Sequence, residues 1–181
     1  MTRKSKRVKK TKHTSIHTLP VDRYFNLIEQ QIVQGNYAEA VVTCERLLNY
    51  LPQQVPQRVA VLTQLGTAQA MLQNFPQSYA VLTEALTLAP KNADLWYNRS
   101  ITSRFLSRFG QALQGIQRAI ELNTRSELTE KFSKEWQFCR KIVEESIKLR
   151  GPHFTLDQLI EQENPFSEGS RIHESREVGG S

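Results

Sequence analysis

The feature that most constrains the fold of this chain is an internal repeat that occupies its first two-thirds. The aromatic residues Tyr37, Phe75 and Phe109 are separated by 38 and then 34 residues, and each is followed three positions later by a small residue. The same two intervals separate two further sets of landmarks, namely Leu48, Leu86 and Ile120, and Pro52, Pro90 and Thr124. A 34-residue period with one four-residue insertion, placed at residues 55–58 in a Pro- and Gln-rich link, predicts a stack of similar structural units.

Each period divides into two segments whose apolar residues recur every three or four positions. Such spacing places the apolar side chains on one face of an α-helix. In the first period the segments are separated by Gly35-Asn36, which permits a tight turn, and the second segment is closed by Pro52. The alternating β-branched pattern typical of strands is absent from the repeats. The sequence therefore predicts an all-α chain of three helix–turn–helix units.

These residues resemble the tetratricopeptide repeat (TPR). Three copies are predicted at residues 21–54, 59–92 and 93–126. The first copy supplies Tyr24, Leu27, Gly35, Tyr37, Ala40 and Pro52; the second supplies Leu62, Leu65, Gly66, Phe75, Ser78, Ala85 and Pro90; the third supplies Trp96, Ser100, Phe109, Ala112 and Ala119. The resemblance implies a right-handed α-solenoid. Arg99 stands where the repeat has an apolar residue, so we expect the third copy to be locally irregular.

The segment after the repeats has the pattern of a terminal cap. Apolar residues recur every three or four positions from residue 126 to 150, and Trp136 lies at the middle of this stripe. A solenoid needs a last helix with one apolar and one polar face, so we expect this segment to cover the third repeat. Gly151-Pro152 ends it, and residues 154–163 are predicted to form a short amphipathic helix with Thr155 as N-cap.

Charge divides the chain into three regions. The net charge is +6, but residues 1–20 hold seven Lys or Arg and no acidic residue, which leaves 17 basic and 18 acidic residues for the rest. We expect a basic disordered arm at residues 1–20, a repeat domain with its capping helix at 21–150, and the short helix followed by a disordered acidic tail at 151–181. Residues 3–12 could make weak contacts with nucleic acid or an anionic surface, or could act only as a solubilising leader.

The sequence offers little for catalysis. All four histidines lie outside the repeats, Cys44 and Cys139 fall on apolar stripes, and no Gly-rich phosphate loop occurs. We therefore expect no enzymatic activity, no cofactor and no metal site. The chain also lacks an apolar run long enough for a transmembrane segment or a signal peptide, and two cysteines do not form a disulfide framework. These observations favour a cytoplasmic protein.

The resemblance implies a function in binding. In the family, the first helix of each repeat lines a concave groove that takes an extended or helical segment of a partner protein. The groove residues expected here are Phe25, Asn26, Glu29, Gln64, Thr67, Met71, Tyr97, Asn98, Ile101 and Arg104. Basic residues that clamp a ligand's terminal carboxylate in some members are absent from the matching positions, although Arg104 and Arg108 could favour an acidic segment. Two alternatives stay open: an adaptor that binds nucleic acid through the basic arm, and a structural subunit that self-associates.

Overall fold

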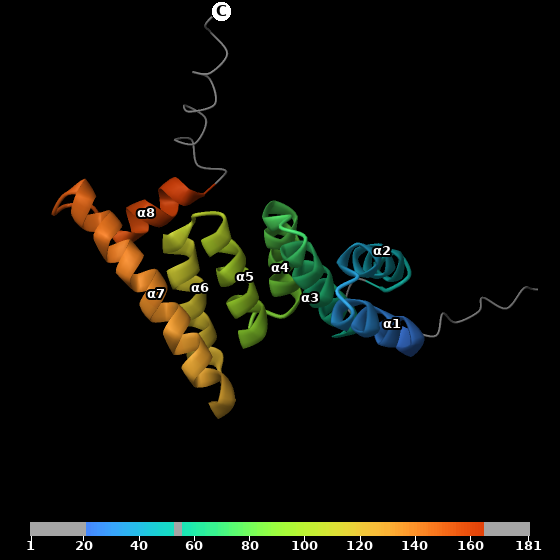
Figure 1. Cartoon of the computed structure of the whole chain (residues 1–181). Helices are drawn as coiled ribbons and strands as arrows, with labels where there is room; N and C mark the ends of the chain where they lie inside the picture. The colour runs from blue at the N-terminus through green and yellow to red at the C-terminus, as the bar shows by residue number, and fades with distance from the viewer. Residues whose placement is uncertain (1–20, 53–55, 165–181) are drawn as a thin grey trace, which may run out of the picture.

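The computed structural model describes residues 21–52 and 56–164 (Figure 1). Within these ranges the chain forms eight helices, which are α1 (Val21–Val33), α2 (Tyr37–Leu48), α3 (Pro56–Met71), α4 (Phe75–Leu88), α5 (Ala93–Phe105), α6 (Phe109–Leu122), α7 (Ser126–Arg150) and α8 (Leu156–Glu163). From α1 to α7, each helix packs on the next, and α8 packs mainly on α6. This is the predicted α-solenoid. The basic arm at residues 1–20 and the tail at 165–181 lie outside the described residues.

The turns within the three repeats share one backbone geometry. Gly35, Gln73 and Ser107 all have positive φ angles, of 78°, 62° and 59°. The residue after each of them donates a backbone hydrogen bond to the carbonyl five positions earlier, at 2.8–2.9 Å, which satisfies carbonyls that the helix end leaves free. These three positions are spaced by 38 and 34 residues, so the backbone repeats with the period seen in the sequence.

The three described residues of the four-residue insertion belong to a helix and not to a link. Helix α3 begins at Pro56 and is 16 residues long, whereas α1 and α5 have 13. Three of the inserted residues therefore extend α3 at its N-terminus. The last of them, Arg58, is buried and donates hydrogen bonds from Nη1 to the carbonyls of Leu48 (3.1 Å) and Leu51 (3.5 Å). The insertion thus ties the second repeat to the C-terminal end of α2.

Small residues allow the paired helices to approach closely. A Cβ atom on Gly66 would lie 2.7 Å from the side chain of Leu82, and one on Gly115 would lie 3.0 Å from the Cβ of Ser100. The buried apolar residues form three core clusters along the solenoid. The first is built by α1, α2 and α3, the second by α3, α4 and α5, and the third by α5, α6 and α7. The core therefore runs along the stack of helices instead of gathering at one centre.

The third repeat is regular, which corrects the expectation built on Arg99. Helix α5 runs without interruption from Ala93 to Phe105. The guanidinium of Arg99 lies over the rings of Trp96 (4.5 Å) and Tyr79 (5.7 Å), an arrangement in which a cation is attracted to the aromatic face. An aromatic environment thus accommodates a charged residue at a position where the repeat usually has an apolar one.

Helix α7 covers the third repeat as predicted, but its main anchor is not the expected one. Phe132 is 1% exposed and its ring stacks on Tyr97, with the ring centroids 4.7 Å apart. Trp136, placed by the sequence at the middle of the apolar stripe, is only half-buried and packs at the edge of this cluster. Among the described residues, no helix is both long and apolar enough to cross a membrane.

Helix α8 packs across one edge of the last helices, mainly against α6. Its N-cap is Thr155, whose side chain accepts a hydrogen bond from the backbone of Gln158 in a capping box. At its other end, the Glu163 carboxylate accepts hydrogen bonds from the backbone N–H groups of Gly110 and Gln111, both at 2.8 Å. A negative charge at the N-terminus of a helix is favourable, so Glu163 joins α8 to the start of α6.

Candidate partner-binding groove

The first helices of the second and third repeats form a pocket with the capping helix. The pocket has a volume of about 300 Å³. Thr67, Ala70 and Met71 line it from α3, and Tyr97, Asn98, Ile101 and Arg104 line it from α5; α7 contributes Glu135. The remaining lining residues are Gly66, Ser78, Leu82 and Thr102, all of which are buried. The last turns of α3 and α5 thus stand on either side of a largely buried floor.

The polar groups of the pocket floor are used within the protein. The Ser78 hydroxyl donates to the carbonyl of Gly66 (2.8 Å), and the Thr102 hydroxyl donates to the carbonyl of Asn98 (3.0 Å). The two hydroxyl oxygens lie 3.2 Å apart. Because these buried groups already have partners, they hold the helices together and leave little hydrogen-bonding capacity for a ligand.

Two polar side chains at the pocket retain that capacity. Neither the carboxamide of Asn98 nor the hydroxyl of Tyr97 has a hydrogen-bond partner among the described residues. Burial raises the pKa of the Tyr97 phenol, and the nearby Glu135 carboxylate raises it further. The phenol therefore stays protonated at neutral pH, and the pocket presents one amide and one hydroxyl to a ligand.

Among the described residues, the one cation that lines the pocket is Arg104, and it is paired. Nε of Arg104 lies 2.7 Å from the Glu135 carboxylate, and the two side chains are 25% and 17% exposed. The negative charge of Glu135 offsets the attraction that Arg104 was expected to have for an acidic segment. Arg108, the other candidate, does not line this pocket; its guanidinium lies over the Tyr79 ring at 5.3 Å. The sequence did not indicate Glu135 as a pocket residue, because periodicity describes each helix by itself and this ion pair joins α5 to α7.

The structure brings together six of the ten residues predicted for the groove. These six line the pocket and are Thr67, Met71, Tyr97, Asn98, Ile101 and Arg104. The other four do not line it. On α1, Phe25 packs against the first core cluster, while Asn26 and Glu29 are exposed; Gln64 on α3 is half-buried.

An exposed aromatic surface adjoins the pocket, and the sequence analysis did not identify it. The rings of Phe75 and Phe105 stack with centroids 4.7 Å apart. The guanidinium of Arg104 lies 4.5 Å from the ring of Phe105 and 5.4 Å from that of Phe138. We call Phe75, Phe105 and Phe138 the aromatic ledge. Phe105 and Phe138 are 51% and 48% exposed, and Met71 in the adjoining pocket is 55% exposed.

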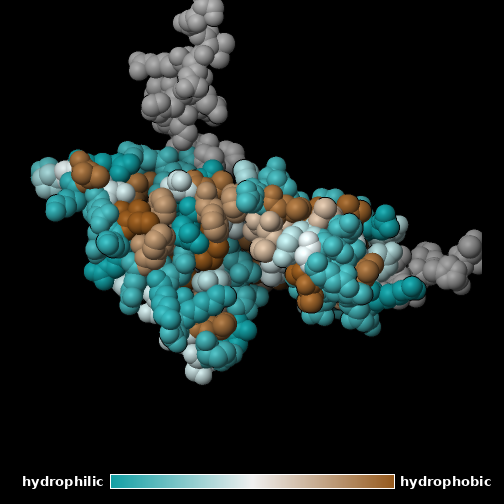
Figure 2. Space-filling view, viewed as in Figure 1, coloured by the Kyte–Doolittle hydropathy of each residue, from teal (hydrophilic) through white to brown (hydrophobic). Residues whose placement is uncertain are grey.

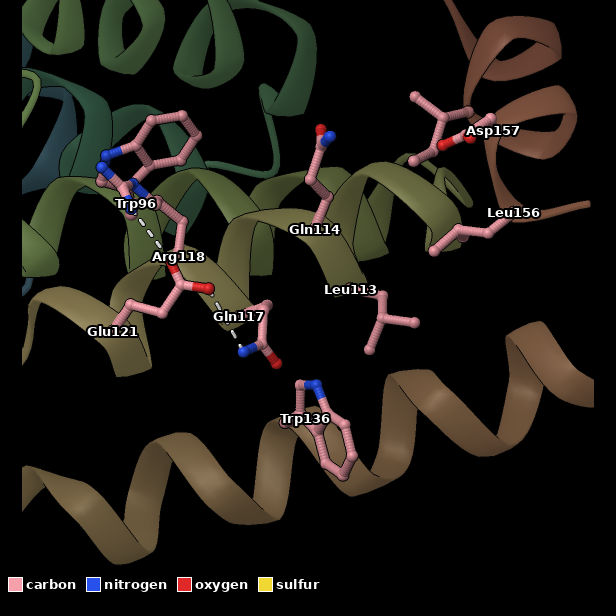
Figure 3. A pocket seen from close by; sticks show the side chains of 10 residues that line it. Trp96, Leu113, Gln114, Gln117, Arg118, Glu121, Trp136, Leu156 and Asp157 are labelled. Atoms are coloured by element: carbon pink, nitrogen blue, oxygen red, sulfur yellow. Dashed lines mark hydrogen bonds and ion pairs between the residues drawn. The ribbon is translucent and has the colours of Figure 1, made fainter.

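A second cavity, of about 590 Å³, lies where α6, α7 and α8 meet. Its apolar residues include Leu113, Trp136 and Leu156, whose side chains are shown in Figure 3. Apolar residues also gather at this junction on the face seen in Figure 2. None of the predicted groove residues lines this cavity.

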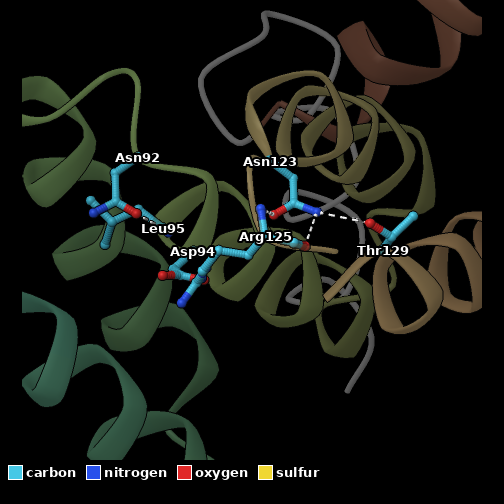
Figure 4. Close-up of polar contacts among 6 residues, drawn as sticks. All are labelled: Asn92, Asp94, Leu95, Asn123, Arg125 and Thr129. Atoms are coloured by element: carbon cyan, nitrogen blue, oxygen red, sulfur yellow. Dashed lines mark hydrogen bonds and ion pairs between the residues drawn. The ribbon is translucent and has the colours of Figure 1, made fainter. Parts of the chain in front are cut away.

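Polar contacts fix the junction between α5 and α7 (Figure 4). Arg125, which precedes α7, forms an ion pair with Asp94 in the first turn of α5. Asn123 donates from its amide to the carbonyl of Arg125 at 2.9 Å, and Asn92 caps α5 by accepting from the backbone of Leu95. Asp94 is therefore already paired.

Comparisons with solved structures define the fold. A TPR domain of Sgt2 from Aspergillus fumigatus superposes with a TM-score of 0.63 at 14% identity, over 75% of this chain and 86% of that one. A double mutant of MamA RS-1 gives a TM-score of 0.61 at 14% identity, over 88% of this chain and 78% of that one. The first TPR of Spaghetti (RPAP3), bound to the HSP90 peptide SRMEEVD, gives 0.56 at 19% identity over 65% and 90%.

The chain therefore has the TPR fold, which confirms the resemblance seen in its sequence. No protein-family model matches the sequence, and no curated protein matches it either.

Proposed function

We propose that this protein is a cytoplasmic, non-catalytic interaction module that binds an extended segment of a partner protein in the groove between α3, α5 and α7. The observation that carries the proposal is the pocket beside Asn98. A carboxamide without a partner among the described residues stands there next to apolar walls, and such a group can both donate to and accept from a peptide backbone. The solved RPAP3 domain, of the same fold, was determined with a peptide bound.

The chemistry of the site supports binding more than catalysis. Its charged lining residues, Arg104 and Glu135, are paired with each other. Cys44 and Cys139 are buried, and burial raises the pKa of each thiol to about 12, so neither presents a thiolate at neutral pH. Two free thiols also suit a reducing compartment.

The test is a selection of peptides from a random display library with the full-length protein. The pocket variant Ala70→Trp should lose the selected peptides, because an indole at this half-buried position would fill the pocket. Ala80→Trp is the matched control, since Ala80 is exposed on α4 and does not line the pocket. Peptides that bind both variants as they bind the wild type would show that the groove is not the binding site.

A further inference from the structure

We propose that the groove selects an uncharged, apolar segment, with one bulky side chain in the pocket and a second apolar or proline residue against the aromatic ledge. This inference rests on the proposed function and names the chemistry of its ligand. It contrasts with the acidic peptide SRMEEVD that is bound to the RPAP3 domain.

The charge of the one cation lining the described pocket is offset. Nε of Arg104 is paired with Glu135, so a ligand carboxylate that approached the remaining N–H groups of this guanidinium would also meet the negative charge of Glu135. Another cation, Lys131, lies over the ring of the pocket residue Tyr97 at 4.5 Å. Among the described residues that line the pocket, the charged side chains are Arg104 and Glu135. Because these two are paired, the pocket presents a nearly neutral surface.

The pocket is small and its walls are apolar. A volume of about 300 Å³ is at the lower limit for ligand sites, which suits a single anchoring side chain. Ala70, Met71 and Ile101 provide apolar walls. Methionine adapts its shape to different apolar partners, so several large aliphatic or aromatic anchors fit this description.

The aromatic ledge offers a second apolar surface beside the pocket. Exposed aromatic side chains that cluster on a surface mark interaction sites, and Phe105 and Phe138 are about half-exposed. Arg104 contacts both rings and also lines the pocket, so the two surfaces are continuous. Aromatic-lined grooves bind proline-containing extended segments well, because these segments lose little conformational entropy on binding.

The experiment analyses the composition of the peptides selected by the full-length protein. Peptides that bind the wild type but not the Ala70→Trp variant depend on the pocket. These peptides should be enriched in Leu, Ile, Phe, Trp and Pro and depleted in Asp and Glu. In fluorescence polarisation, SRMEEVD should bind at least about tenfold more weakly than the best selected peptide. Pocket-dependent peptides enriched in Asp or Glu would overturn the inference while leaving the proposed function intact. A selection that yields no pocket-dependent peptide would overturn both.

A charge variant provides the second readout. Glu135→Gln removes the negative partner of Arg104 and keeps the size of the side chain, so affinity for SRMEEVD should rise by about tenfold. Lys131→Gln is the control for the cation over the Tyr97 ring and should leave the wild-type preference for uncharged peptides unchanged. The inference is wrong if the wild type already binds SRMEEVD as tightly as any selected peptide and Lys131→Gln abolishes that binding. The groove would then prefer acidic ligands.

Discussion

Arg58 on α3 and Glu84 on α4 form an ion pair in which Nη2 lies 3.0 Å from the carboxylate oxygen. The same guanidinium donates to two carbonyls at the end of α2. One side chain thus joins three consecutive helices, and it belongs to the inserted residues that break the strict period.

Replacing Arg58 with Ala should lower the free energy of unfolding by about 1–3 kcal/mol, because two carbonyls near the end of α2 lose a buried donor. Urea denaturation of the two proteins measures this. Arg46→Ala is the control, since Arg46 is exposed on α2 and should change stability by less than about 0.5 kcal/mol. Equal losses in both variants would show that Arg58 does not join the helices.

Phe132→Ala should cost about 3–5 kcal/mol, the usual range for truncating a buried aromatic residue, since its ring is fully buried against Tyr97. Trp136→Ala should cost less, because Trp136 is half-buried. Thermal and chemical denaturation of the two variants compare them directly. A greater loss for Trp136→Ala would restore it as the anchor that the sequence suggested.

The two thiols should make stability depend on alkaline pH. Burial first, and then the neighbouring Glu45 and Glu135 carboxylates, raise the pKa values of Cys44 and Cys139 to about 12. Unfolded thiols have a pKa near 8.5, so folding favours the protonated form. This contribution to stability is complete below about pH 8.5 and is lost as the pH rises towards 12.

Denaturation at several pH values between 8 and 11 measures this loss, and the double variant Cys44→Ala/Cys139→Ala should show a smaller one. Both thiols should also react slowly with iodoacetamide at pH 8 in the native protein and quickly in urea. Rapid native alkylation would contradict their burial.

Asn98→Ala should weaken binding of a selected peptide by about 1–3 kcal/mol, because a buried peptide group would lose its partner. It should scarcely change the melting temperature, since the Asn98 carboxamide bonds to no described residue. Isothermal titration and a thermal melt give the two values, with exposed Asn49→Ala as control. Unchanged affinity would exclude Asn98 as a contact.

Deleting residues 2–20 should leave the helical signal of residues 21–164 nearly unchanged and should remove most low-salt binding to nucleic acid. The prediction depends on the seven basic residues of this segment and on counterion release. Circular dichroism and titrations with a DNA oligonucleotide at two salt concentrations test it. Strong residual binding would point instead to basic residues on the solenoid.

Sequence periodicity predicted the elements well, because each helix turns one apolar face to its neighbours. The expected cap at residues 126–150 coincides with α7, and Thr155 is the N-cap of α8 as predicted. Periodicity could not predict contacts between helices. It placed Arg58 in a link, and it left Arg104 free because its partner Glu135 lies on the capping helix. The aromatic ledge escaped notice for the same reason, since Phe105 and Phe138 come from different helices.

The hydrogen bonds between the Glu163 carboxylate and the start of α6 show that the folded domain is longer than its three repeats. The last repeat ends near residue 126, yet a carboxylate more than fifty positions after Gly110 satisfies the first backbone groups of its second helix. A chain cut after Arg150 would keep all three repeats but would expose those N–H groups and the surface that Leu159 covers. Such a chain should therefore be less stable than one that extends to residue 164.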